Sequence, residues 1–358
     1  MTGSGAESHS PGDEAGNGRP RAGAVGPRRR ALVTGATGMV GPRVLDAFRQ
    51  AGFAVRTLSN TPPDSGSVPA DVEVRTGEIS DKATVRAAVA GVTVVVHLAA
   101  LLHIPDPPAS LGDAYERTNV GGTRTVVEAS VAAGVERVVF FSTIAVYGEA
   151  TGDVFTEDSP VRPATLYAKT KAEAERIVLV GRTAAGTPMG VVLRPGAVYG
   201  ARVKGNYRRL VRALARRRFV PIGPGSNRRA MVYDKDVAEA AVLAATHPVA
   251  AGRVYNVSDG EEHTLSEIIA TICVALGRTP PRWHVPLGPV RAGVGLVESA
   301  ARVVGARPLV SRATIDKYTE DIAVDSRRIR DELGFAPRYD LRAGWREAIG
   351  QMREAGEI

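Results

Sequence analysis

Three side chains of this sequence could together move a proton at a hydroxyl-bearing carbon. Tyr167 and Lys171 are four residues apart, which places them on one face of a helix. A phenol has an ordinary pKa of about 10, and a neighbouring ammonium group lowers it toward the range of a useful general base. Thr143 follows an apolar run at 135–142, and a hydroxyl at the end of a buried strand can hydrogen-bond the same substrate oxygen. The three groups therefore predict hydride-transfer chemistry at a carbinol carbon.

A glycine-rich loop near the start of the chain predicts nucleotide binding. Gly35, Gly38 and Gly41 are spaced three apart, directly after an apolar run at 30–34 and before a helical stretch at 42–51. The first glycine allows a tight turn, the second lets the backbone approach a pyrophosphate, and the third permits close packing of helix on strand. The amino-terminal end of the helix then attracts the anion.

Short apolar runs alternate with amphipathic stretches from residue 30 onward. Strands are expected at 30–34, 54–58, 71–76, 92–98, 135–142 and 190–193, with helices between them at 42–51, 81–90, 123–133 and 167–180. This alternation predicts an α/β fold with a Rossmann-like, doubly wound parallel sheet. After about residue 198 the alternation breaks down. Helices are expected there at 207–217, 237–246, 265–276 and 326–333, with a strand at 253–258.

The chain is therefore expected to have three regions. Residues 1–29 form a tail rich in Gly, Ser, Pro and Ala, a composition typical of disorder. Residues 30–198 form an NAD(P)-binding domain of Rossmann type, because a nucleotide loop and hydride chemistry together imply a nicotinamide cofactor. Residues 199–358 form a smaller C-terminal α/β lobe that mainly binds substrate, with some elements returning to the first domain.

Composition excludes several other classes. The 358 residues are 44% hydrophobic and include one cysteine, Cys273, which excludes a disulfide scaffold and a cysteine-rich zinc domain. No spacing of His, Cys, Asp and Glu suggests a metal site. No apolar stretch is long enough to span a bilayer, and residues 1–29 lack the apolar core of a secretory signal, so a cytoplasmic protein is expected. The net charge is +8, but aromatic residues make up only 5% and do not interleave with the basic ones, which argues against nucleic-acid binding.

Nearly everything after residue 30 resembles the extended short-chain dehydrogenases/reductases, in the NAD-dependent epimerase/dehydratase family that includes nucleotide-sugar epimerases. The resemblance rests on the glycine loop, on Tyr167 and Lys171, and on further motifs. These are His97-Leu-Ala-Ala100, Asn119-Val-Gly-Gly-Thr123, Ser142-Thr-Ile-Ala-Val-Tyr147-Gly148 and Arg194-Pro-Gly-Ala-Val-Tyr199-Gly200.

The resemblance implies a role for each matching residue. Thr143 would be the catalytic hydroxyl, Tyr167 the acid/base, and Lys171 its partner, which also holds the nicotinamide ribose. The residues implied in cofactor binding are Gly35, Thr37, Gly38, Met39, Val40, Gly41, Ser59, Asn60, Glu78, Ile79, Leu98, Ala99, Ala100, Tyr167, Lys171, Arg194 and Pro195. His97 would belong to the cofactor loop rather than act as a base, His103 would be an ordinary loop residue, and Asn119 would steady the sheet edge from a kinked helix.

Two of these positions depart from the family pattern. Ser59 and Asn60 end the second strand, where an acidic residue would bind an adenosine ribose 2′-hydroxyl, and no clear arginine stands there for a 2′-phosphate. Glu78 precedes Ile79 where the family usually has Asp before a hydrophobic residue. NAD and NADP therefore both stay open, with NAD favoured by the resemblance.

The resemblance also bears on the substrate. Ile144 and Ala145 stand where sugar 4,6-dehydratases carry Asp-Glu, which argues against dehydration and leaves epimerisation or simple oxidoreduction. Arg229 falls where sugar-nucleotide enzymes bind a diphosphate, and its fork of donors suits phosphate, although a solvated basic face is the alternative. The expected substrate is a nucleotide-activated sugar that reacts at C4. The residues expected to bind it are Ser142, Thr143, Arg229 and Arg312.

Two other functions remain open. A 3β-hydroxysteroid dehydrogenase-like enzyme would share Tyr167 and Lys171, the following Ala172-Glu-Ala-Glu175 and a tail comparable to residues 306–312. In such an enzyme the amphipathic segment 285–304 of this chain could line an apolar pocket or touch a membrane. A non-catalytic cofactor-sensing regulator would usually lack the Tyr or the Lys, and both are present. The family suggests a homodimer through the helices at 123–133 and 166–180.

Overall fold

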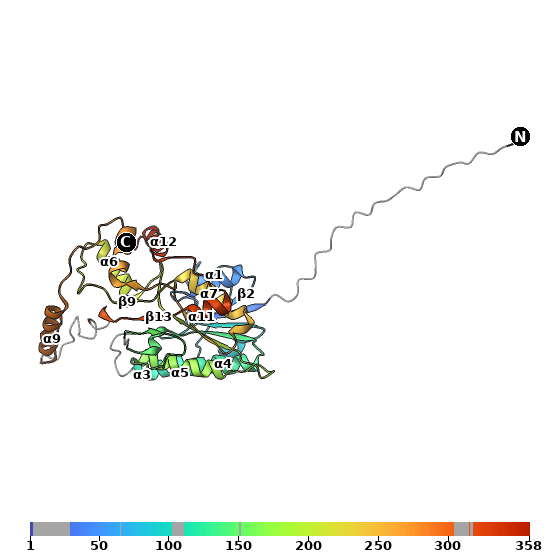
Figure 1. The fold of residues 1–358 in the computed structure, drawn as a ribbon. Helices are drawn as coiled ribbons and strands as arrows, with labels where there is room; N and C mark the ends of the chain where they lie inside the picture. The colour runs from blue at the N-terminus through green and yellow to red at the C-terminus, as the bar shows by residue number, and fades with distance from the viewer. Residues whose placement is uncertain (3–28, 65, 102–110, 150–151, 304–314, 316–317) are drawn as a thin grey trace.

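The structure is a computed structural model that describes residues 1–2, 29–64, 66–101, 111–149, 152–303, 315 and 318–358. At its centre is a seven-stranded sheet in the order β11-β7-β5-β4-β1-β2-β3, in which every pair is parallel (Figure 1). Its strands are β1 (Arg30–Thr34), β2 (Ala54–Ser59), β3 (Glu73–Thr76), β4 (Val94–His97), β5 (Arg137–Phe141), β7 (Gly190–Pro195) and β11 (Val254–Val257). The order reverses between β1 and β4, and ligands bind such sheets at the carboxyl ends of the strands beside that reversal. The doubly wound α/β fold expected from the sequence is confirmed.

Except for the edge strand β3, which is largely exposed, the strands are mainly apolar on both faces, which explains why the sheet is buried between two layers of helices. In β1, Ala31 and Val33 pack on one face and Leu32 packs on the other. Because successive side chains alternate between faces, only near-continuous apolar runs can fill both. One face is covered by α1 (Gly41–Gln50), α7 (Asp234–Thr246) and α11 (Arg327–Leu333), and the other by α2 (Lys82–Val89), α4 (Gly122–Ala132) and α5 (Leu166–Val180) (Figure 1).

A separate core holds the C-terminal part of the chain together. It lies among α6 (Gly205–Ala215), α8 (Leu265–Ala275), α12 (Leu341–Glu354), β8 (Ala197–Tyr199) and β10 (Met231–Tyr233). Trp345 of α12 is fully buried there and stacks on Tyr199 with ring centroids 4.8 Å apart. We predicted no element over 341–354, so α12 is a finding of the structure.

Two small sheets join distant parts of the chain. β9 (Arg228–Arg229) pairs with β12 (His263–Thr264), and β6 (Val154–Phe155) pairs with β13 (Ala323–Val324). The remaining elements are α3 (Gly112–Tyr115), a π-helix (Glu116–Gly121), two 3₁₀ helices (Ile144–Tyr147 and Pro248–Ala250) and α9 (Leu287–Val303). Nearly all of the expected tail over 1–29 lies outside the described residues. Within the described residues, none of the helices combines the length and the apolar character that crossing a membrane requires.

The close approach of α5 to β7 gives a test of this packing. A Cβ added at Gly190 would lie 2.1 Å from the carbonyl oxygen of Val178, so Gly190→Ala forces helix and strand apart. We expect it to lower the free energy of unfolding by about 1–3 kcal/mol, the usual range for overpacking. Gly350→Ala is the matched control, because a Cβ there in α12 meets nothing within 4 Å.

Gly350→Ala should raise stability by up to about 1 kcal/mol, because alanine loses less backbone entropy than glycine in a helix. Urea unfolding of both variants measures the two effects. Equal midpoints for the two variants would contradict the close contact between Gly190 and α5.

Candidate active site

The glycine loop joins β1 to α1 and is held by contacts that exclude side chains. Gly35 has a φ of +71°, and a Cβ there would lie 2.7 Å from the amide nitrogen of Ala99. A Cβ at Gly41 would lie 2.2 Å from the carbonyl oxygen of Ala36. Both glycines are therefore required by the backbone, one for a left-handed turn against the β4 loop and one for close helix packing. The loop fits the cradle that a dinucleotide pyrophosphate needs at the start of a helix.

The other residues expected at the cofactor lie around this loop. The Ala99 amide donates to Thr34 Oγ1 over 3.2 Å, which fixes the 98–100 turn against the loop. At the end of β2, the Ser59 hydroxyl is buried and has no hydrogen-bond partner among the described residues. The Gly77 amide donates to the Ser59 carbonyl over 2.9 Å, so the turn that carries Glu78 is joined to the end of β2. An unpartnered hydroxyl at a strand end fits a site for a ribose hydroxyl.

The remaining members of the set are placed on the same edge of the sheet. Thr37 is exposed at the loop, whereas Met39 and Val40 are partly buried and pack toward the two cores. Asn60 and Glu78 are exposed, and Ile79 is buried.

Asn119 lies in the π-helix and binds the loop after β4. Its side chain accepts a hydrogen bond from the Leu101 amide over 2.7 Å and donates to the Leu101 carbonyl over 3.3 Å. It also donates to Thr170 Oγ1 of α5 over 3.1 Å. The wider π turn aims this side chain at the sheet edge, as a kink in a helix at a functional site commonly does.

His97 is locked in its neutral form. Thr123 Oγ1 donates its only proton to the Asn119 carbonyl, so His97 Nε2 must donate to Thr123 Oγ1 over 3.0 Å. Nδ1 then accepts from Thr34 Oγ1 over 2.7 Å. Burial, and after it the charge of Lys171, lower the pKa of His97 to about 3. His97 therefore ties β1, β4 and α4 together and is not available as a base at neutral pH.

Thr143 stands where β5 ends. It has an extended backbone and caps the following 3₁₀ helix, with its Oγ1 accepting from the Ala145 amide over 3.2 Å. The side chain is half-buried. Since that bond uses only the oxygen as acceptor, the hydroxyl proton has no acceptor among the described residues and can be donated to a substrate oxygen.

Tyr167 and Lys171 occupy the first turns of α5. Thr165 begins the helix by accepting from the Ala168 amide over 3.2 Å. The Lys171 Nζ lies 4.0 Å from the centre of the Phe140 ring, close to the end of β5. Burial lowers the pKa of Lys171 to about 7, and burial, then Tyr115, raise the pKa of Tyr167 to about 12. Burial is the main cause of the raised pKa of Tyr167 in this structure, and a lowering of that pKa by the ammonium stays a prediction.

Glu175 is a residue that sequence reasoning did not place in the site. It is buried one turn after Lys171, and its carboxylate accepts from the Ser142 hydroxyl and from Arg194 at both oxygens, over 2.9 and 2.6 Å. Arg194 also donates to Tyr147 Oη over 3.0 Å, and Tyr147 donates to Asn256 over 2.6 Å. The signal available in the sequence was its spacing of four from Lys171.

This network uses the side chains of two residues expected to touch ligands. The Ser142 hydroxyl is directed to Glu175 rather than to an open site, and Arg194 is only 4% exposed within its ion pair. Pro195, the next residue, is buried at the end of β7. Their predicted contacts with substrate and cofactor stay predictions, and for Arg194 they would have to come from the backbone.

Arg229 lies on β9 close to the element that follows Thr143. Its neighbour Ala230 packs against Ile144 and Tyr147 of the 3₁₀ helix. The Arg229 guanidinium is 3.5 Å from a Glu320 carboxylate oxygen and donates to the Tyr318 carbonyl over 3.1 Å. Part of its charge is thus already balanced. Arg228 is tied more tightly, with bonds to Asp321, Glu262 and the Gly152 carbonyl.

The other candidates do not add to this site. His103 and Arg312 lie outside the described residues.

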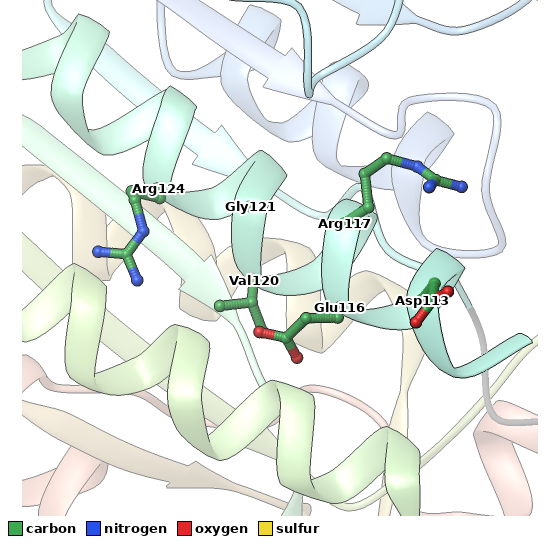
Figure 2. Close-up of a pocket in the computed structure, with 6 residues that line it drawn as sticks. All are labelled: Asp113, Glu116, Arg117, Val120, Gly121 and Arg124. Atoms are coloured by element: carbon green, nitrogen blue, oxygen red, sulfur yellow. The ribbon is translucent and has the colours of Figure 1, made fainter.

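A hollow of about 340 Å³ opens on the outer surface of α3, the π-helix and α4, and Figure 2 shows the side chains that line it. Its lining includes Asp113, Glu116, Arg117 and Arg124 but none of the three residues expected in catalysis. The described part of the chain contains no group of three or more His, Cys, Asp or Glu side chains that could hold a metal ion.

Comparisons with known proteins define the class. The profile of the NAD dependent epimerase/dehydratase family matches residues 31–258, so the chain belongs to this family. It is 28% identical to a UDP-glucose 4-epimerase of Vibrio cholerae over 90% of this chain and 95% of that one. It is 27% identical to a 3 beta-hydroxysteroid dehydrogenase/Delta 5-->4-isomerase of Mycobacterium tuberculosis over 89% of each chain.

A solved structure extends the comparison to ligands. MoeE5 in complex with UDP-glucose and NAD matches with a TM-score of 0.71 and 28% identity, covering 91% of this chain and 99% of that one. The protein is accordingly an enzyme of the NAD-dependent epimerase/dehydratase type with an extended short-chain dehydrogenase/reductase fold. The family resemblance inferred from the sequence motifs is confirmed.

The neutral state of His97 can be observed directly. Because its pKa is lowered from 6.5 to about 3, the imidazole should stay neutral, with the proton on Nε2, from pH 8 down to pH 5. Two-bond ¹H–¹⁵N spectra of the histidine rings report this tautomer, and the spectrum of His97→Gln assigns the signals. The stability that His97 contributes is fully present above pH 6.5 and is lost as the pH falls toward 3, since the unfolded chain then binds the extra proton. An ordinary titration of the assigned ring near pH 6.5 would be incompatible with the bonds to Thr34 and Thr123.

Proposed function

We propose that this enzyme epimerises a nucleotide-activated sugar at C4, by oxidising the C4 hydroxyl and reducing the resulting ketone from the other face. The observation that carries the proposal is the placement of Tyr167 and Lys171 at the start of α5, next to the end of β5 where Thr143 stands. This edge of the sheet also carries the glycine loop. A family member of known structure binds UDP-glucose and NAD, and a relative is a UDP-glucose 4-epimerase.

Tyr167 and Lys171 would handle the proton. With pKa values of about 12 and about 7, the phenol keeps its proton at neutral pH and the amine is divided between its two forms. The charged form of Lys171 would favour the phenolate form of Tyr167, which would take the proton of the C4 hydroxyl as hydride leaves C4. Tyr167 would return that proton to the same oxygen when the ketone is reduced. Thr143 would donate a hydrogen bond to the same oxygen and hold it in place.

The family is NAD-dependent, and bound NAD supplies the hydride acceptor for the oxidation. Gly35, Gly38 and Gly41 would hold the pyrophosphate through backbone amides, and the Ser59 hydroxyl would meet a ribose hydroxyl. Lys171 would contact the nicotinamide ribose. The buried Ile144 stands where an acid would be needed to eliminate water, so dehydration is not proposed.

Arg229 supports a diphosphate-bearing substrate. It is the predicted phosphate ligand, it is partly exposed, and its neighbour packs beside the residues that follow Thr143. Its fork of donors suits a phosphate, which would compete for the guanidinium with Glu320 at 3.5 Å. We also propose that the protein forms a homodimer through α4 and α5, where Val131 is 40% exposed and Val180 is 70% exposed. A cytoplasmic location is proposed as well.

A second candidate is oxidation of a hydroxysteroid. Arg229 and Glu320 balance part of each other's charge, which lowers the positive potential that would favour a diphosphate. A 3 beta-hydroxysteroid dehydrogenase/Delta 5-->4-isomerase is also among the relatives at similar identity. In this case the same three residues would act on a carbinol carbon of an apolar substrate.

Removing the phenol hydroxyl tests the catalytic assignment. Tyr167→Phe should lower kcat for UDP-glucose epimerisation about 10²- to 10⁴-fold, the usual contribution of a general acid/base, while NAD still binds. Turnover is followed by chromatography of the sugar nucleotides, and retained NAD by mass spectrometry. Tyr339→Phe is the control, because it removes a phenol that bonds Lys235 away from these residues. Unchanged turnover in Tyr167→Phe would remove Tyr167 from the mechanism.

Neutralising Arg229 separates the two substrate classes. Arg229→Gln should raise KM for UDP-sugars at least tenfold with a smaller change in kcat, because a charge-assisted bond to phosphate contributes about 1.5–3 kcal/mol. It should leave the KM for a 3β-hydroxysterol unchanged. Arg342→Gln, at an exposed position of α12, is the control for loss of one positive charge. Turnover of the sterol alone, with the same KM in Arg229→Gln, would establish the second candidate.

A further inference from the structure

Residues 200–233 are strongly basic, and neither they nor residues 268–297 contain an acid. The first of these two segments includes the three consecutive arginines Arg216, Arg217 and Arg218. The proposed chemistry uses only Arg229 of all their positive charges. Several of these charges are paired with acids from elsewhere in the chain, as Arg208 and Arg212 are with Glu357. Only the arginines without such a partner are expected to attract an anionic ligand.

The structure brings the two segments side by side. A parallel bridge joins Ile222 to Val285, with the Gly223 amide donating to the Val285 carbonyl over 2.8 Å and the Val285 amide donating to the Pro221 carbonyl over 2.9 Å. Two residues before this bridge, the segments carry Val220 and Trp283. Their exposed fractions are 46% and 69%, which makes Trp283 a large apolar side chain in water.

We call this surface the Trp283 patch. It consists of Arg216, Arg217, Arg218, Val220, Arg282 and Trp283, all of them exposed. None of its four arginines forms an ion pair with any residue that the structure describes. The second tryptophan, Trp345, is fully buried in α12, so the two tryptophans have opposite environments.

Arg217 occupies a backbone position that favours glycine. It lies two residues after the end of α6 with a φ of +55°, and the Arg217 and Arg218 amides close the helix on the Leu214 and Ala213 carbonyls over 3.1 and 2.9 Å. Glycine is the usual residue at this point of such a helix end, because an L side chain is strained there. In this chain the position is occupied by Arg217, so three consecutive arginines are present although the backbone at Arg217 is strained.

The patch leads directly into α9, which begins at Leu287. In Figure 1 α9 lies at the margin of the molecule, far from the seven-stranded sheet. Its Val290 and Val294 lie four residues apart on one face and are half-buried, whereas Arg291 is exposed. The same face also carries Glu298 one turn after Val294, so the positive charge of this surface lies before α9 rather than on it.

We propose that the Trp283 patch docks this enzyme on an anionic lipid bilayer. Arginines next to a surface of anionic lipid are attracted to it, and tryptophan favours the boundary between headgroups and acyl chains. The exposed, aliphatic Val220 suits insertion between lipids. A single-stranded nucleic acid would instead need several aromatic side chains on which successive bases stack, and the patch has one. The contact is peripheral and reversible.

Intrinsic fluorescence tests the docking, because Trp283 alone should respond. The full-length protein is mixed with vesicles of phosphatidylcholine, or of phosphatidylcholine with about one third phosphatidylglycerol. With the anionic vesicles we expect a blue shift of the emission and sedimentation of the protein, both lost at high salt. With neutral vesicles we expect neither. Trp283→Phe should lose the blue shift while it still sediments, since Trp345 is already buried.

Arg217→Gly is the most informative variant, because it removes a positive charge and also relieves the backbone strain at residue 217. Its melting temperature should equal or exceed that of the wild type, and its affinity for anionic vesicles should fall about threefold or more. Combining Arg217→Gly with Arg216→Gln and Arg218→Gln should weaken binding at least tenfold. Arg342→Gln, an exposed arginine on α12, should bind as the wild type does.

Three results would overturn the proposal. They are absence of binding to anionic vesicles at low salt, equal binding to neutral vesicles, and full affinity in the triple variant. Stronger binding of the patch to poly(dT) than to vesicles would assign it to nucleic acid and would also overturn it. Tyr167→Phe should still dock, so failure of the docking is distinguishable from failure of the proposed reaction.

Discussion

The buried carboxylate of Glu175 is the interaction on which the arrangement of the site depends. An unpaired charge at this depth would be strongly destabilising, so α5 must present Glu175 to Arg194 of β7 and to Ser142 after β5. Those bonds set how α5 lies against the ends of both strands. Because Thr143 is next to Ser142 and Lys171 is one turn before Glu175, the same carboxylate positions the groups expected in catalysis. Arg194 extends the constraint through Tyr147 to Asn256 of β11.

A second set of bonds does the same for the cofactor side. His97, held between Thr34 and Thr123, ties the ends of β1 and β4 to α4 just where the strand order reverses. The close contact of Gly35 with Ala99 packs the glycine loop against the turn after β4 at that point. Both networks are buried and hydrogen-bonded, which allows polar groups to specify geometry inside an apolar sheet. The two networks therefore fix the ends of the strands around the glycine loop and around Thr143.

The sequence predicted the features that are determined by residues close together in the chain. Most of the central strands follow from apolar runs, although β3 is polar and exposed. The glycine spacing predicted the tight turn before α1, and the spacing of four placed Tyr167 and Lys171 on one helix. It did not predict the small sheets, since β6 and β13 pair across a long stretch of the chain and are only two residues long. Nor could it show that Glu320 faces Arg229 or that α12 closes the second core through Trp345, because these contacts join residues far apart in sequence. The raised pKa of Tyr167 was missed because burial, unlike spacing, is not visible in a motif.

Burial acts on Tyr167 and Lys171 in opposite directions, and the result suits a reversible reaction. It raises the pKa of the acid and lowers that of the base, so both shifts favour the uncharged forms. A phenol that holds its proton and an amine that is only partly charged avoid a fixed, buried ion pair. A permanently ionised pair would favour proton removal alone, whereas an epimerase must remove a proton from an oxygen and return one to it within a single turnover. The depth at which α5 is buried, and hence the Glu175 bonds that hold it there, would then set the balance between the two half-reactions.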